Sequence, residues 1–357
     1  MYKSRKGPFL LVLIAIAFPG YGRCQYLKDI DRDELNKLQR IIPPPGAIEL
    51  KLIRAFPTPE QEEAGHFLPR PDSFSQDRLG NFYIADQLSN VIYVYDSSGK
   101  YINQLGQPGQ GPGDLSLPRH IAVFDDVIHI NDVGNRRIQY FDLKGQVIRT
   151  NRIFKSYTDL NFMRDGQMVG APLYVEDAED VAMIDILASD GKLLRSFGAP
   201  FKFKYDQSSM NNRMILINSK GEVILVYRFL AAIQKYSNQG DLFKESKIET
   251  EFSSEKEKIN RRMNSYLPDQ KAAKCIVFCA AGIMDEKIYI IDHIPSRIWI
   301  WEIEPNFEIS RTFWANTGDT CVIRDFCPTA INGRMSFLVL GVLTEDEEMR
   351  IHILSPK

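Results

Sequence analysis

Glycine recurs along this chain at a nearly constant interval, and that interval restricts the fold more than any other feature of the sequence. Gly99, Gly145 and Gly191 are 46 residues apart, and Gly240 follows 49 residues later. Each of these glycines ends a polar turn and precedes a short segment that contains aliphatic residues. A period in the forties with about four short strands per unit is typical of the blades of a β-propeller.

The best-preserved unit runs from Asp77 to Gly106 and contains three segments with the composition of short β-strands. Its segments Asn81–Asp86, Val91–Tyr95 and Tyr101–Leu105 are rich in aromatic and β-branched residues and are separated by polar turns. One unit of this kind cannot cover its own apolar faces, so further copies are needed to build a core. Five more units follow it along the chain, at Pro118–Ile153, Leu160–Gly198, Met214–Ile248, Cys275–Phe313 and Arg324–Leu354.

The two ends of this array of units complement each other. The sixth unit ends after its third strand, and Ile48–Phe56, before the first unit, alternates like a strand. Pairing of the two ends would supply the missing fourth strand and remove an exposed sheet edge. The sequence therefore predicts an all-β fold, a six-bladed β-propeller of four-stranded antiparallel blades over residues 47–357, in which an N-terminal strand completes the last blade.

Two of the units carry a resemblance to a known family. Leu117–Val123 followed by Asn131–Ile138 resembles an NHL repeat, as does the unit of Asp77–Gly106. The third unit replaces the turn motif with Tyr174–Asp180, and the fifth has Asn306 where earlier units have glycine. The chain as a whole resembles the exported bacterial six-bladed β-propellers of NHL type. The resemblance implies the fold and little about activity, because this fold hosts enzymes, receptors and scaffolds alike.

The first 24 residues have the composition of an export signal. A positive segment that includes Lys3 and Arg5 precedes the apolar run Phe9–Phe18, and Pro19 ends that run. We expect a signal peptide over residues 1–24, with an uncleaved anchor, or a lipid anchor on Cys24, as alternatives. Residues 25–46 then form a short helix and a proline-rich lead-in. This predicts an exported protein, periplasmic, at the cell surface or secreted, with no membrane span after cleavage and a monomeric state.

One insertion interrupts the array between the fourth and fifth units. Ser253–Lys274 has the pattern of a helix, for which Ser254 and Glu257 would form a capping box. It is either a surface helix packed on the rim or a lid or partner-binding element, since long insertions in compact domains are often functional.

Export permits disulfides, and four cysteines follow Cys24. Cys275 and Cys279 are too far apart along an extended strand to bond each other, as are Cys321 and Cys327. A disulfide would therefore join one pair to the other, and buried free thiols are the alternative. No CxxC pair supports a four-cysteine metal site.

Catalytic motifs and a nucleic-acid-binding composition are both missing from the sequence. The 44 basic residues balance 46 acidic ones, so a non-specific affinity for nucleic acid is not expected. Neither a Gly-x-Ser-x-Gly nor a His-Glu-x-x-His motif occurs. His120 begins an innermost strand and could reach the central channel, but no other histidine has the equivalent position, so no cofactor is predicted. Calcium on the axis, bound by Asp159, Asn161 and Asp325, is an alternative.

Basic residues occupy matching positions in several units. Five fall at or just before the start of an innermost strand, and three more lie in turns between second and third strands: Arg70, Arg119, Arg213, Lys274, Arg324, Arg136, Arg228 and Arg297. If the registers are equivalent, these side chains and His120 lie around one mouth of the channel and favour an anionic ligand. Alternatively, each pairs with a nearby carboxylate such as Asp72, Asp159 or Asp325.

The sequence thus predicts an exported, non-enzymatic binding or scaffold propeller that recognises a small anionic ligand or a protein partner at the channel mouth. The alternative is a propeller hydrolase or lyase with a metal ion on the central axis. Convergence of Asp, Asn, Glu or His side chains at one point of the channel would favour the enzyme.

Overall fold

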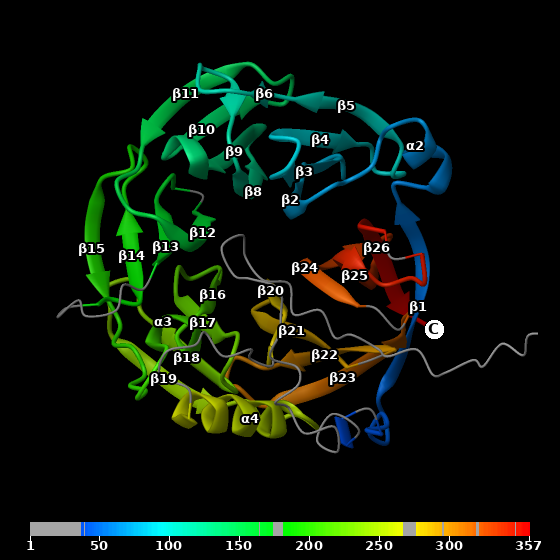
Figure 1. The fold of residues 1–357 in the computed structure, drawn as a ribbon, viewed down its shortest axis with the longest axis vertical. Coiled ribbons are helices and arrows are strands. Elements are labelled where there is room, and N and C mark those ends of the chain that lie inside the picture. Colours follow the sequence, from blue (N-terminus) through cyan, green and yellow to red (C-terminus); the bar gives the residue numbers. More distant parts are fainter. Residues whose placement is uncertain are drawn as a thin grey trace, which may run out of the picture.

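Six four-stranded antiparallel sheets surround a central axis, as the sequence predicts (Figure 1). The computed structural model describes residues 37–38, 40–163, 165–173, 181–266, 276–294, 296–318, 321–346 and 348–357. The predicted signal peptide and most of the expected lead-in helix lie outside these residues. None of the helices within the described residues is long and apolar enough to cross a membrane.

Each blade runs from an innermost to an outermost strand in chain order. Blade one contains β2 (Pro71–Gln76), β3 (Phe82–Asp86), β4 (Val91–Tyr95) and β5 (Tyr101–Leu105), and blade two β8 (Pro118–Phe124), β9 (Val127–Asp132), β10 (Arg137–Asp142) and β11 (Val147–Arg152). Blade three contains β12 (Tyr157–Phe162), β13 (Met168–Pro172), β14 (Ile184–Leu187) and β15 (Leu193–Phe197), and blade four β16 (Arg213–Ile217), β17 (Val223–Tyr227), β18 (Ala232–Tyr236) and β19 (Leu242–Lys247). Blade five contains β20 (Ala280–Met284), β21 (Lys287–Ile294), β22 (Arg297–Ile303) and β23 (Ile309–Asn316).

Blade six is built from both ends of the chain. Its inner strands are β24 (Val322–Ile331), β25 (Arg334–Val342) and β26 (Arg350–Pro356), and β1 (Ile48–Phe56) is the fourth strand. β1 pairs antiparallel with β26, from Leu50 opposite Pro356 to Phe56 opposite Ile351. The start of β1 also pairs in parallel with β23, so blades five and six form one eight-stranded sheet. The predicted closure of the ring by the N-terminal strand is confirmed (Figure 1).

The hydrophobic core lies between blades. The second and third strands of a blade are buried along their whole length, as in β3 and β4, whereas the outermost strand β5 is largely exposed. Side chains of blades one and two share one apolar cluster that includes Ile92 and Ile130, and blades six and one share another that includes Phe82 and Leu340. Each sheet therefore needs a neighbour on both faces, which explains why a single unit cannot fold alone.

The recurring glycines lie where one blade closely approaches the blade before it. Gly99 and Gly145 have φ of +83° and +85°, a left-handed conformation that favours glycine. A β-carbon on Gly99 would lie 2.6 Å from Phe56, and one on Gly145 would lie 2.8 Å from Leu105. In blade five the residue at the position of these glycines is Phe307, with a φ of +67°. Comparison of the repeated units of the sequence had placed Asn306 there.

Shorter elements decorate the ring. They are α2 (Pro59–Glu63), the small ribbon β6 (Gln107–Pro108) with β7 (Asp114–Leu115), the 3₁₀ turn η2 (Val133–Asn135), α3 (Gln207–Met210) and α4 (Ser253–Tyr266).

Residues Ser253–Tyr266 of the expected insertion form a helix, α4, while residues 267–274 lie outside the described residues. Helix α4 lies on the outer rim near β19 and β22 (Figure 1). Thr250 and Ser253 exchange two hydrogen bonds between side chain and amide, so they form the reciprocal cap in place of Ser254 and Glu257. Glu257 instead accepts a hydrogen bond of 2.9 Å from the amide of Ala231 in blade four.

Candidate functional site: the channel mouth

A β-bulge interrupts the innermost strand of four blades at the same place, near its first residue. The pairing with the second strand skips Asp72 in β2, His120 in β8, Thr158 in β12 and Arg324 in β24, whereas β16 and β20 pair regularly. His120 has a φ of +44°, which accompanies the irregularity. A bulge redirects the side chain of the extra residue, and bulges are frequent beside functional sites. Here they place three ionisable side chains near the beginning of the inner strands, which defines the channel mouth.

Side chains from neighbouring blades meet at this mouth. Arg119 forms a salt bridge of 3.1 Å with Asp72 of the preceding blade, and both side chains are largely buried. His120 Nδ1 lies 3.4 Å from Oδ1 of Asp159 in the following blade. Arg228, in the turn after β17, donates a hydrogen bond to the carbonyl of Cys279 in blade five.

These groups also act on one another across the channel. The charge of Asp72 in blade one influences the guanidinium of Arg228 in blade four, on the opposite side of the ring. We call the six residues Asp72, Arg119, His120, Asp159, Arg228 and Arg324 the mouth cluster.

The cations of the mouth cluster disfavour each other's charged forms. Burial lowers the pKa of Arg228, against the effect of Asp159, Cys279 and Asp72, and Arg119 lowers it further. Burial likewise lowers the pKa of Arg324; Asp72 raises it, and Arg70, Arg119 and Arg228 add repulsion. The pKa of His120 is below its ordinary value, mainly through burial and then through Arg119, although Asp159 and Asp72 act in the opposite direction. An anion placed among these groups would reduce this repulsion.

Two nitrogen atoms in the cluster lack a hydrogen-bond partner. Among the described residues, the buried Nε of Arg324 and the buried Nε2 of His120 have none. Buried polar atoms are nearly always hydrogen-bonded, and each exception needs an explanation such as a bound ion or a ligand.

The carboxylates near the mouth join blades to one another. Asp159 accepts a hydrogen bond of 2.7 Å from the amide of Ile215 in blade four. Asp325 accepts one of 3.0 Å from the amide of Phe74 in blade one. Burial raises the pKa of Asp325 to about 7, against the effect of the amides of Phe74 and Phe326. Of the predicted pairings with carboxylates, those of Arg119 and His120 are therefore present, while Asp325 is bound to backbone amides.

The other predicted basic residues have different positions. Arg213 is 2% exposed, and its guanidinium donates to the carbonyls of Met183, Asn211 and Pro172 between blades three and four. Arg136 is exposed at the left-handed end of η2, and Arg297 donates to the carbonyl of Ile41. The structure does not bring these three guanidinium groups into the cluster: Arg213 lies in β16, which lacks the bulge, Arg136 follows η2, and Arg297 begins β22. Arg70 lies near the mouth cluster, because its charge contributes to the lowered pKa of Arg324. Lys274 lies outside the described residues.

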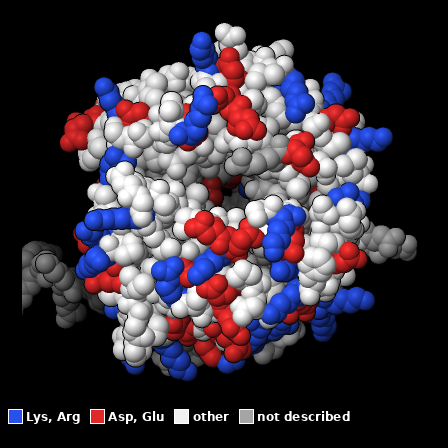
Figure 2. Space-filling model, turned by 180° about the vertical axis from the view of Figure 1, so that it is seen from behind, with Lys and Arg blue, Asp and Glu red and all other residues white. Residues whose placement is uncertain are grey.

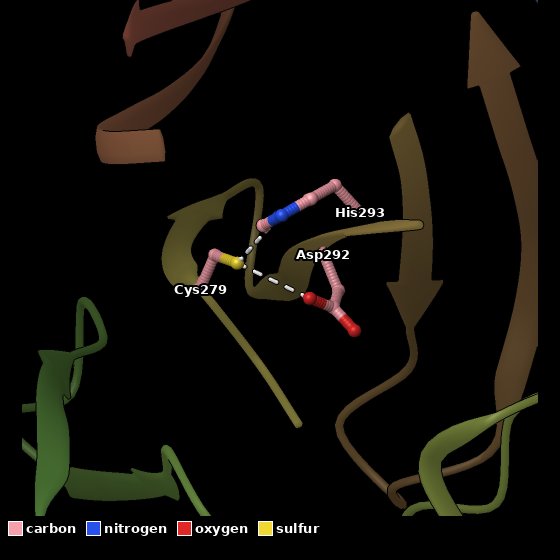
Figure 3. A group of neighbouring side chains, drawn as sticks. All are labelled: Cys279, Asp292 and His293. Atoms are coloured by element: carbon pink, nitrogen blue, oxygen red, sulfur yellow. Dashed lines mark hydrogen bonds between the residues drawn. The ribbon is translucent and has the colours of Figure 1, made fainter. Parts of the chain in front are cut away.

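A second group of potential ligands lies in blade five and adjoins the mouth cluster, because Arg228 donates to the carbonyl of Cys279. The sulfur of Cys279 lies 3.1 Å from Oδ1 of Asp292 and 3.3 Å from Nδ1 of His293 (Figure 3). Lys256 of α4 pairs with Oδ2 of Asp292 and donates a 3.0 Å hydrogen bond to the carbonyl of His293. In the described part of the chain this is the one group of three or more His, Cys, Asp or Glu residues whose ligand atoms all lie within 4.8 Å of one another.

This second group does not have the properties of a cysteine nucleophile. Burial raises the pKa of the Cys279 thiol well above its ordinary value, and Asp292 raises it further. Burial, together with Lys256, lowers the pKa of His293 to about 3, so the imidazole cannot act as a cationic partner for a thiolate near neutral pH. A reactive cysteine needs a depressed pKa and access to solvent, and Cys279 is 2% exposed.

The sequence alone drew attention to Cys279 only as a possible disulfide partner or buried free thiol, and it did not single out His293, which lies in β21. The register of the β20–β21 hairpin pairs Ala280 with Ile291, which places Cys279 opposite Asp292. The hairpin turn at Asp285 and Glu286 was visible in the sequence and could have revealed this proximity. The described cysteines Cys279, Cys321 and Cys327 carry free thiols, and Cys275 lies outside the described residues.

Charge on one face of the ring is mixed. Figure 2 shows this face, with basic and acidic side chains interspersed around a central hollow and no broad area of a single sign. On this face, no extended charged surface offers an alternative to the converging groups of the channel mouth as a candidate for ligand recognition.

Comparisons with known proteins agree with this architecture. A family model described as a 6-bladed beta-propeller, DUF5128, matches residues 75–165. Among solved structures, a Bacteroides fragilis protein described as exported is 13% identical, with a TM-score of 0.55 over 86% of this chain and 95% of that one. Virginiamycin B lyase from Staphylococcus aureus is 13% identical, with a TM-score of 0.51 over 86% of this chain and 100% of that one.

A third similar structure is the PQQ-bound aldose sugar dehydrogenase of Streptomyces coelicolor, 13% identical with a TM-score of 0.53 over 88% of this chain and 100% of that one. At these identities the likeness concerns the fold alone. The chain is a six-bladed β-propeller, and its structural neighbours include enzymes as well as a protein described as exported.

Proposed function

We propose that this chain is an exported, monomeric binding propeller of NHL type that takes up a small anionic ligand at the mouth cluster. Residues 1–24 would act as the signal peptide, and no catalytic step is assigned to the channel. The observation that carries the proposal is the presence of two buried, unpartnered nitrogens, Arg324 Nε and His120 Nε2, among cations that repel each other.

The charge balance of the mouth favours an anion. Arg70, Arg119, Arg228 and Arg324 contribute four positive charges. Asp72 and Asp159 supply two negative charges, and Asp325, with a pKa of about 7, supplies a third only in part at neutral pH. An anionic group would accept from Arg324 Nε, and from His120 Nε2 once the imidazole takes up a proton, and it would reduce the repulsion among the guanidinium groups.

The position of the donors favours a small ligand over a protein surface. Arg324 Nε and His120 Nε2 are buried, and Arg119 is 17% exposed. A carboxylate or phosphate group can enter such a site, whereas the acidic side chains of a folded partner would contact the exposed rim first.

The axial-metal enzyme is less well supported. Within the described residues, the one converging group of potential metal ligands lies in blade five, whereas the acidic groups at the mouth are engaged by Arg119, His120 and backbone amides.

Calorimetric titration of the purified protein with phosphate, sulfate and mono-, di- and tricarboxylates at low salt tests the proposal. We expect at least one anion to bind, and Arg324→Met to weaken binding by about 10- to 100-fold, since a hydrogen bond to a charged group contributes about 1.5–3 kcal/mol. Arg78→Met is the matched control, because Arg78 lies in the turn at the other end of β2 and is exposed. Absence of binding to every anion, or equal affinities of wild type and Arg324→Met, would contradict the proposal.

A further inference from the structure

We propose that Cys279, Asp292 and His293 form a zinc-binding site in blade five, next to the mouth cluster. The three residues come from one hairpin, Cys279 just before β20 and the other two near the end of β21. Sulfur, imidazole nitrogen and carboxylate oxygen are the three ligand types that zinc accepts in proteins. Calcium and magnesium prefer oxygen alone, so the donor set selects a transition metal or zinc.

The ligand atoms are already gathered as a tetrahedral site requires. All three lie within 4.8 Å of one another, with the sulfur 3.1 Å from the carboxylate oxygen and 3.3 Å from the imidazole nitrogen. Zinc–sulfur and zinc–nitrogen bonds of ~2.3 and ~2.0 Å at a tetrahedral angle separate the ligands by about 3.5 Å. The two distances from the sulfur are within a few tenths of an ångström of this value, and the carboxylate oxygen and the imidazole nitrogen lie within 4.8 Å of each other (Figure 3).

The same position in two other blades has a purely structural function. Asp86 and Asp132, like Asp292, are the fully buried aspartates near the end of a second strand. Asp86 accepts a hydrogen bond of 2.7 Å from the amide of Arg70, and Asp132 accepts one of 2.7 Å from the amide of Ser116, each on the connection entering the blade.

The residues opposite these aspartates are Pro71 and Pro118, which have no polar side chain. Cys279 takes this place in blade five, and Asp292 turns one oxygen to its thiol. Blade five thus differs from blades one and two by having a side chain that can bind a metal, Cys279, opposite the buried aspartate.

Lys256 orients the carboxylate of Asp292 for metal binding. Its ammonium pairs with Oδ2 of Asp292 and leaves Oδ1 directed toward Cys279. Metal-binding carboxylates and imidazoles usually have such an outer hydrogen-bond partner, which orients them. A zinc ion with one thiolate and one carboxylate is formally neutral, so Lys256 adds one positive charge. Cys321 is close enough for the charges of Asp292 and Lys256 to act on its thiol, and a second thiolate there would balance that charge.

The test uses the full purified chain, stripped with a chelator, loaded with zinc and freed of excess metal. We expect one zinc per chain by elemental analysis for wild type and for Cys327→Ser, which alters a thiol of β24 outside the group. Cys279→Ser and His293→Gln should lose the metal and show affinities more than ~100-fold weaker in chelator competition, since even loss of an outer partner costs ~10–100-fold.

Cobalt provides a second readout that does not depend on the stability of a variant. The cobalt-loaded wild type and Cys327→Ser should show a thiolate-to-cobalt charge-transfer band, which Cys279→Ser lacks. Asp72→Asn, which alters the mouth cluster, should keep its zinc. A wild type that retains no zinc, equal zinc content in Cys279→Ser, or loss of zinc in Asp72→Asn would overturn the proposal, and none of these results bears on anion binding by Arg324.

Discussion

Buried arginines have opposite surroundings at the joints between blades and at the channel mouth. Between blades three and four, Arg213 donates to three carbonyl oxygens. In blade two, Arg137 binds Asp132 and the carbonyls of Gln110, Gly111 and Asp114. At the mouth, Arg324 has an unpartnered Nε and is surrounded by other arginines.

Arginine therefore has a structural role at the joints between blades and a proposed binding role at the channel mouth. A guanidinium offers five donors in a fixed fork, so carbonyl groups at the end of several strands can satisfy it completely and fix the blades. Where a donor is left over and several like charges lie nearby, as at Arg324 beside Asp72 and three arginines, the arrangement costs stability and is retained for another reason, such as binding. Substitutions at the two places should therefore have opposite effects.

The largest effect is expected from Arg213→Met. Three carbonyl oxygens would lose their partner in a buried joint, at about 1–3 kcal/mol for each unsatisfied group, so the free energy of unfolding should fall by about 3–5 kcal/mol. Urea unfolding monitored by tryptophan fluorescence measures this, with Arg78→Met as the exposed control that changes stability by less than ~0.5 kcal/mol. A loss below about 1 kcal/mol would mean that Arg213 does not fix the joint.

Arg324→Met should leave the ligand-free protein as stable as the wild type or up to about 1 kcal/mol more stable. The substitution removes a buried donor without a partner and relieves repulsion among Arg70, Arg119 and Arg228. The same unfolding experiment at low salt and without added anion tests this. A marked loss of stability would place Arg324 with Arg213 as a structural arginine.

The affinity for anions should rise as the pH falls from about 8 to about 6. The pKa of His120 lies below its ordinary value in the empty site, and a bound anion would raise it, so binding takes up a proton. Each unit by which the anion raises this pKa corresponds to up to about tenfold in affinity.

Asp325, with a pKa of about 7, contributes in the same direction, because its protonation makes the mouth more positive. His120→Gln should flatten the pH dependence seen by calorimetry, and Asp325→Asn should flatten it less. A wild-type affinity that does not change with pH would exclude His120 and Asp325 from the binding site.

The smallest effect concerns the stability of the empty protein. The carboxyl of Asp325 keeps a proton up to a pH of about 7 in the folded state, whereas its ordinary pKa of 3.8 applies after unfolding. The folded state binds more protons between these values, so stability should fall as the pH rises from about 4 to about 7. Asp325→Asn should lack this pH dependence, as thermal unfolding at both ends of the range would show.

The fold could be predicted from the sequence because one physical requirement is repeated along it. Gly99, Gly145 and Gly240 recur since each turn closely approaches the preceding blade, and a β-carbon there would overlap Phe56, Leu105 or Phe197. The fifth blade escapes this pattern because Phe307 adopts the left-handed conformation without glycine. The spacing of the glycines therefore predicted the turns of four blades and was a weaker signal in the fifth.

The candidate site could be predicted only in part. Arg119, His120, Arg228 and Arg324 were recognised by their positions in the repeat, but a bulge shifts the pairing by one residue and leaves no mark in the amino-acid composition. For that reason the sequence could not distinguish Arg324, redirected by a bulge, from Arg213, which continues a regular strand. The group of Cys279 and Asp292 depends on hairpin register, which was within reach of the sequence.

The closure of the ring joins two strands that lie far apart in the sequence. β1 (Ile48–Phe56) precedes the other described strands, and its partner β26 (Arg350–Pro356) follows them. Contacts of such long sequence separation form slowly because the connecting chain must first be ordered. Until they form, the blades next to the gap lack an apolar neighbour, so the pairing of Leu50 with Pro356 should be a late step in the folding of the ring.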